Sequence, residues 1–218
     1  MVPVHGMTAS LLAAVLLLLS NHLYATTLTD DIRDIQHEWA RIKYQAGESE
    51  QEKLYEALAA KAATVTARYP GKAEPLVWQG IIYSTWAGAK GGLGALSLAR
   101  ESRKQLEAAI AIDPRALQGS AYTSLGTLYF KVPGWPIGFG DSQKAEELLK
   151  RALEINPDGI DPNFFYGEFL LDEDRYAESV AVLNHALQAA PRPDRPIADA
   201  GRKAEILDTL DMARKHLE

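Results

Sequence analysis

The chain has 218 residues, of which 47% are hydrophobic and 24% charged, and it contains no cysteine. This composition excludes global disorder, and the lack of cysteine excludes thiol catalysis, disulfides, cysteine-based zinc sites and a lipid anchor on an N-terminal cysteine. With 23 Lys and Arg against 29 Asp and Glu, the formal net charge is −6. This acidic balance argues against a general nucleic-acid-binding protein.

The first segment predicts export. Residues 11–19 form an unbroken apolar run, LLAAVLLLL, and the earliest Asp, Glu, Lys or Arg is Asp30. The run is shorter than the ~20 residues that span a bilayer, so it is typical of the apolar core of a signal peptide. We expect residues 1–25 to be a signal peptide cleaved near Ala25, with the mature protein in the periplasm. Because no Lys or Arg precedes the run, an uncleaved N-terminal membrane anchor or a buried helix is the alternative.

Residues 26–72 are expected to form a degenerate pair of helices. The first covers Thr29 to about Ala46, and the second runs from Glu50 to Arg68 and stops before Pro70. Proline cannot continue the hydrogen-bond ladder of a helix, so it marks the end of this pair.

Residues 73–191 contain three units that end with the same spacing, Leu-x-x-Ala-x4-Pro. These endings are Leu106, Ala109 and Pro114, then Leu149, Ala152 and Pro157, then Leu183, Ala186 and Pro191, each preceded by a helical segment with a marker glycine at Gly80, Gly126 or Gly167. In the second unit the apolar residues 145, 148, 149, 152 and 153 make one helical stripe. No run of alternating β-branched residues indicates strands.

This spacing resembles the tetratricopeptide repeat, a helix–turn–helix unit of 34 residues, which is also the interval from Pro157 to Pro191. The resemblance implies an all-α fold, a solenoid of antiparallel helix pairs. Residues 192–218 then form a stiff linker, Arg192-Pro-Asp-Arg-Pro196, and a capping helix from Ile197 to Leu217. The expected total is nine helices, four pairs and the cap.

Two of the repeats have long turns between their helices. The interval from the marker glycine to the second helix is 22 and 19 residues in the first two units, against 12 in the third. The extra residues, 85–94 and 131–141, hold seven of the 16 glycines and two of the four tryptophans. Because stacked repeats keep their register, both turns are expected on one edge. They predict either a ligand-binding pocket or two turns that only pack together, and the pocket would comprise Trp86, Lys90, Trp135, Phe139 and Asp141.

The repeat geometry also predicts which first-helix residues line an inner groove. These are Ile81, Ser84, Thr85, Thr123, Thr127, Phe130, Lys131 and Glu168. With Lys131 as the one basic residue among them, a site that clamps a peptide carboxylate is not expected. The groove suits an apolar helix or strand of a partner, or one of the protein's own ends.

No pattern predicts catalysis. The sequence has no His-x3-His, no His-Glu-x-x-His and no Gly-x-Ser-x-Gly, and the Gly-rich turns lack Gly-x4-Gly-Lys-Ser/Thr. The turn acids Asp158, Asp161, Asp172, Glu173 and Asp174 are interpreted as helix caps. We therefore expect no catalytic residues, metal or cofactor.

The phrases Gly-Gly-Leu-Gly and Pro-Gly-Trp-Pro-Ile-Gly-Phe-Gly-Asp look similar to exported proteobacterial repeat proteins near the TatT component of TRAP transporters. That family has a periplasmic lipoprotein as its known member, so the resemblance implies a transporter solute-binding protein as partner. The missing lipid-attachment cysteine departs from this family. We expect a non-catalytic protein-interaction or scaffold module with a protein or peptide partner, no nucleic acid, and no membrane span after cleavage. The alternative is a small-ligand-binding or transporter-accessory protein that uses the two turns.

Overall fold

The computed structural model describes residues 27–218 apart from the side chain of Leu93. The predicted signal peptide and its cleavage point at Ala25 lie outside the described residues. Within the described range the chain forms nine α-helices and no strands, which confirms the all-α expectation. The helices are α2 (Leu28–Gln45), α3 (Glu48–Arg68), α4 (Ala73–Lys90), α5 (Gly92–Ile112), α6 (Ser120–Lys131), α7 (Ser142–Ile155), α8 (Ile160–Asp172), α9 (Tyr176–Ala186) and α10 (Pro196–Lys215), with a short 3-10 turn at Ala116–Gly119.

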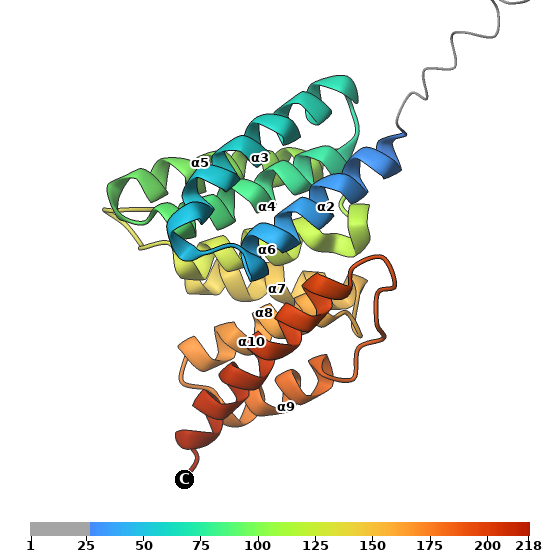
Figure 1. Ribbon diagram of the computed structural model, residues 1–218. Coiled ribbons are helices and arrows are strands. Elements are labelled where there is room, and N and C mark those ends of the chain that lie inside the picture. Colours follow the sequence, from blue (N-terminus) through green and yellow to red (C-terminus); the bar gives the residue numbers. More distant parts are fainter. Residues whose placement is uncertain (1–26) are drawn as a thin grey trace, which may run out of the picture.

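The helices form a two-layer solenoid of the tetratricopeptide-repeat type (Figure 1). Each helix packs antiparallel against the next one in the chain, and the inner layer runs in space from α2 to α4, α6, α8 and α10. Helices α3, α5, α7 and α9 make the outer layer. The inner layer also closes on itself, because α10 packs against α2 as well as α8.

The two helices of each clear repeat approach most closely at the marker glycine. A Cβ there would lie 2.6–2.8 Å from a leucine of the paired helix: Leu106 for Gly80, Leu149 for Gly126 and Leu183 for Gly167. The hydroxyl groups of Ser102 and Ser179 donate to the carbonyls of Gly80 and Gly167, both at 2.7 Å. The sequence spacing therefore marks real contacts, since a larger residue at the glycine would separate the helices.

The first predicted long turn is not a turn. Helix α4 continues through Trp86 as far as Lys90, and α5 begins at Gly92. Gly91 and Gly92 have φ of +62° and +58°, a left-handed conformation that glycine adopts without a Cβ penalty. The additional residues lengthen both helices. Glycine inside a helix costs only about 1 kcal/mol, so Gly88 did not end α4, although it had suggested a loop.

The second predicted turn is a true loop, residues 132–141. Its ends are held together where the Gly140 amide donates to the Pro133 carbonyl at 3.0 Å and the Asp141 amide donates to the Tyr129 carbonyl at 2.8 Å. Figure 1 shows this loop projecting beside α5 at the edge of the molecule. The loop is a fixed feature of the surface because its backbone is bonded at the base.

Candidate functional site

Helix α10 packs against α2 and α8 of the inner layer. Ala198 is buried in the core cluster that α2, α3 and α4 build, and Ile197 packs against that cluster beside Trp39 and Trp78. The occupant expected for the groove, a partner or one of the protein's own ends, stays a prediction.

Asp161 is the centre of a charge cluster that holds α10 in place. Its carboxylate accepts from Arg192 at 2.6 Å and from Arg202 Nε at 2.9 Å. Arg192 also reaches Asp199 of α10 at 2.6 Å. Burial alone would raise the pKa of Asp161, but the guanidinium groups of Arg202 and Arg192 outweigh it and hold the pKa well below its usual range. The cluster joins α8, the linker and α10 by ionised groups.

Glu205 extends this cluster to α2. It accepts from Arg202 at 2.6 Å and from the Tyr44 hydroxyl at 3.1 Å, and Lys43 Nζ lies 3.1 Å away. Burial raises the pKa of Tyr44, which keeps this phenol a hydrogen-bond donor. The side chain of Arg202 is only 6% exposed, so its neutralisation by carboxylates is a condition for the closed inner layer.

Three of the four predicted groove hydroxyls, those of Ser84, Thr85 and Thr127, are hydrogen-bonded within the protein. Ser84 and Thr85 donate to the Ile81 carbonyl at 2.8 and 3.0 Å, and Thr127 donates to the Thr123 carbonyl at 2.9 Å. The Thr85 hydroxyl also accepts from Trp39 Nε1 of α2 at 3.2 Å. These side chains therefore join neighbouring inner helices or cap their own carbonyls.

The polar end of the predicted groove forms an ion pair. Lys131 Nζ lies 2.9 Å from Glu168, linking α6 to α8, and 4.7 Å from the centre of the Phe130 ring. Phe130 in turn packs edge to face on Phe169 at 5.7 Å. The one basic residue of the predicted groove is thus paired with the predicted acidic residue.

The predicted pocket residues of the two turns are placed separately. Trp86 stacks on Tyr83 at 6.2 Å and packs on the first core cluster, and Lys90 pairs with Glu52 of α3. Asp141 caps α7 by accepting from the Lys144 amide at 3.0 Å. Trp86 and Lys90 thus contact α4 and α3, whereas Asp141 contacts α7, and the composite pocket stays a prediction.

The aromatic residues of the loop divide into a packed and an exposed part. Phe139 lies edge to face on Tyr129 at 5.5 Å, with the Arg103 guanidinium 4.5 Å over its ring. Trp135 is 90% exposed and Ile137 is 65% exposed. The loop therefore presents two large apolar side chains on a base fixed to α5.

Sequence reasoning missed the charge cluster. Asp161 was expected to cap a helix, but Gly159 is the N-cap of α8 and Asp161 lies inside the first turn. A signal was present, because the linker carries Arg192 and Arg195 and the next helix carries Arg202, three arginines within eleven residues of a chain with an acidic balance. The isolated pattern could not show that Arg192 and Arg202 bind one carboxylate on α8.

The described residues contain neither a metal-binding cluster nor a helix that could span a membrane. Among residues 27–218, no three His, Asp or Glu side chains gather closely enough to hold a metal ion. None of the helices from α2 to α10 combines the length and apolar character that a bilayer crossing requires.

Comparison with known proteins identifies the class of fold. Residues 137–200 match the family model of the tetratricopeptide repeat. A solved structure described as a thermophilic TPR protein, TTC0263 of Thermus thermophilus, is similar over 87% of this chain and 88% of its own, with 18% identity and a TM-score of 0.59. The protein has the fold of tetratricopeptide-repeat proteins.

More distant similarity extends to the protein MamA. One crystal structure of it covers 78% of this chain and 92% of its own length, with 16% identity and a TM-score of 0.44. No curated protein matches the chain in sequence.

Proposed function

We propose that this protein is a non-catalytic protein-interaction or scaffold module. Its repeat fold supports this reading, since stacked helical repeats provide extended surfaces on a rigid scaffold. The observation that carries the proposal is the exposure of Trp135 and Ile137 on the 132–141 loop. Exposed tryptophan on a fixed loop is characteristic of residues that dominate protein interfaces.

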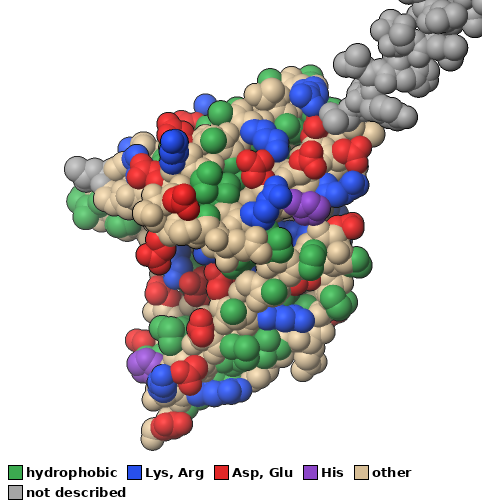
Figure 2. Space-filling model, viewed as in Figure 1, with side chains coloured by type: hydrophobic (Ala, Val, Ile, Leu, Met, Phe, Trp, Pro, Cys, Tyr) green, Lys and Arg blue, Asp and Glu red, His purple; other side chains and the backbone are tan. Residues whose placement is uncertain are grey.

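A second apolar area supports the same proposal. Leu207 and Met212 of α10 are each 56% exposed. In Figure 2 green side chains interrupt the charged surface over α10, in the lower half of the molecule. Single exposed apolar residues are common on protein surfaces. Leu207 and Met212 are therefore weaker support for an interaction surface than Trp135 and Ile137.

We further propose that the module works after export, in the periplasm. The apolar run at residues 11–19 and the absence of cysteine support this location. Mass spectrometry of the protein from a periplasmic fraction should show a chain that begins near Thr26. A full-length chain that remains with the membrane fraction would instead indicate an N-terminal anchor.

The interaction test is a pull-down from cell-envelope extract with the full chain as bait. A protein captured by the wild type and lost with the double variant Trp135→Ala/Ile137→Ala supports the proposal. Gln143→Ala, an exposed change on α7 near the loop, is the control. A bait that captures no protein but carries a small molecule in native mass spectrometry would contradict it and favour a ligand-binding or transporter-accessory role.

A further inference from the structure

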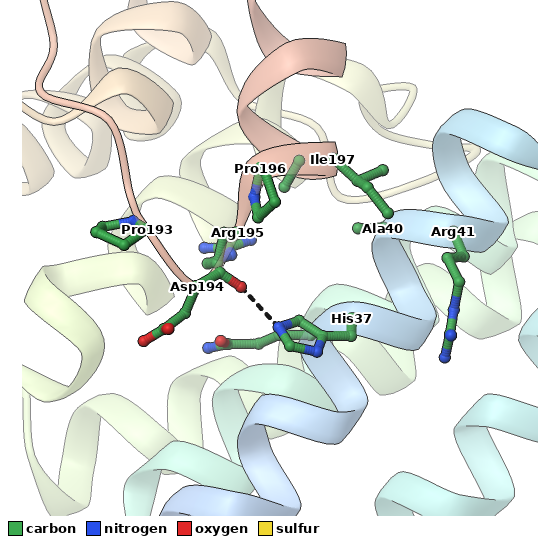
Figure 3. Close-up of a pocket in the computed structure, with 10 residues that line it drawn as sticks. His37, Ala40, Arg41, Pro193, Asp194, Arg195, Pro196 and Ile197 are labelled. Carbon is green, nitrogen blue, oxygen red and sulfur yellow. Dashed lines mark hydrogen bonds between the residues drawn. The ribbon is translucent and has the colours of Figure 1, made fainter.

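A cavity of about 400 Å³ lies between α2 and the linker that leads into α10 (Figure 3). Its apolar walls come from Ala40, Pro193, Pro196 and Ile197. Its polar lining comprises Gln36, His37, Arg41, Asp194 and Arg195. Cavities with apolar walls and a few convergent polar groups are the usual form of small-molecule sites.

Arg195 is the unusual member of this lining. Its guanidinium lies 5.3 Å from the ring centre of Trp78, and its Nε is buried without a hydrogen-bond partner. Throughout residues 27–218, no carboxylate lies within ion-pair distance of Arg195. A half-buried guanidinium without a counterion is costly, so proteins normally pair such groups.

The neighbouring carboxylates are already engaged by other cations. Arg192 and Arg202 bind Asp161, and Arg192 also binds Asp199. Glu205 is shared by Arg202 and Lys43. Arg195 is therefore the arginine of the linker left without a direct carboxylate partner.

The opposite wall of the cavity comes from α2 and is joined to the linker through His37. His37 Nε2 lies 2.6 Å from the Asp194 carbonyl oxygen, and because a carbonyl only accepts, this nitrogen carries the hydrogen. Figure 3 shows the Asp194 carboxylate turned away from the His37 ring. Arg41 makes no ion pair with any described carboxylate. Asp194 is therefore the one carboxylate residue in the lining, and it makes no ion pair with Arg195.

We propose that this cavity binds a carboxylate carried on a small apolar body, with Arg195 as the anchoring cation. The unpaired guanidinium of Arg195 calls for an anion, the apolar walls suit a hydrocarbon body, and the volume limits its size. The carboxylate can belong to a free organic acid or to the C-terminus of a peptide. The site is distinct from the exposed loop, so it goes beyond the interaction surface proposed above.

The test is titration of the full chain, labelled with ¹⁵N, with four probes: benzoate, hexanoate, the tripeptide acetyl-Ala-Ala-Leu with a free C-terminus, and benzamide. The Arg195 Nε–H signal, assigned by its absence in Arg195→Met, should shift with at least one carboxylate and stay in place with benzamide. Shifts with the free acids assign the site to organic acids, and shifts with the tripeptide alone assign it to peptide C-termini. No shift with any carboxylate up to 10 mM, or equal shifts with benzamide, overturns the proposal.

Variants separate binding from packing. Arg195→Met should weaken carboxylate binding about 10- to 100-fold, the loss typical of a charge-assisted contact, and Arg195→Lys should retain part of it. Arg214→Met, which removes an exposed charge from the far end of α10, should leave binding unchanged. The ligand-free Arg195→Met protein should melt at or above the wild-type temperature, because an unpaired charge has been removed. Unchanged carboxylate binding in Arg195→Met would overturn the proposal.

Discussion

Arg202 Nε donates to the Asp161 carboxylate at 2.9 Å and so joins the capping helix to the last complete repeat. Asp161→Asn removes the negative charge from a guanidinium that is almost fully buried. We expect the free energy of unfolding to fall by about 3 kcal/mol, because breaking a buried pair leaves an uncompensated charge. Urea denaturation measures this loss. Asp211→Asn, which breaks an exposed pair with Lys215 on α10, should change it by less than about 0.5 kcal/mol. Equal effects in the two variants would contradict the role of the cluster.

The contact between α10 and α2 can be tested at Gly201. A Cβ at this position would overlap the Tyr44 ring, so Gly201→Ala should push α10 outward and destabilise the protein by about 1–3 kcal/mol. Gly88→Ala is the matched control, since that helical glycine faces open space. It should stabilise the protein by about 0.5–1 kcal/mol through its better helix propensity. Thermal unfolding followed by circular dichroism distinguishes the two signs.

In the 132–141 loop we expect Phe139 to stabilise the fold and Trp135 to contribute to partner binding. Phe139→Ala removes a ring packed on Tyr129 and should cost about 2 kcal/mol, less than a fully buried phenylalanine. Trp135→Ala should alter stability by less than about 0.5 kcal/mol, because the side chain is almost wholly in solvent. Urea unfolding of both variants provides the measurement. A large loss with Trp135→Ala would mean that the indole supports the fold rather than a partner.

Acid should weaken the protein partly through Glu146. Hydrogen bonds from Arg175 and Lys150 lower the pKa of Glu146 from 4.5 to about 2. A carboxyl with a depressed pKa in the folded state stabilises the protein above the unfolded value of 4.5 and loses this contribution as the pH falls toward 2. Glu146→Gln should therefore be less stable than the wild type by about 1 kcal/mol at pH 5.

The measurement for Glu146 is the difference in unfolding free energy between wild type and Glu146→Gln from pH 5 to pH 3. This difference should shrink as the pH falls, because protonation removes the same interaction from the wild type. Glu107→Gln is the control, an exposed acid on α5. A difference that stays constant with pH would show that Glu146 contributes through its shape rather than its charge.

The sequence spacing predicted the repeats well because the contacts within each repeat join residues of two consecutive helices. The marker glycine and its leucine, such as Gly167 and Leu183, lie 16 positions apart on two consecutive helices, and one period of the sequence covers both. The nine helices of the described range followed from the same periodicity. The prediction of a long turn at residues 85–94 was wrong. It took the glycine content of this segment as a sign of a loop, whereas packing of Trp86 and Ala87 keeps the helix continuous.

Local sequence patterns could not predict the charge cluster or the cavity beside it. Tyr44 and Glu205 are separated by 161 positions and meet only because α10 returns to α2. Arg195 and Trp78 meet for the same reason. Repeat geometry predicts how neighbouring units stack, but it does not predict that the last helix will reach the first. The charges of the linker therefore had no visible partners in the sequence.

The return of α10 to α2 also changes how the array can unfold. In an open solenoid each repeat contacts only its neighbours, so a terminal repeat can fray without disturbing the other end. Here the described chain is a ring of inner helices, and loss of α10 exposes apolar surface on the first core cluster as well as the last repeat. The two ends of the array should therefore melt together.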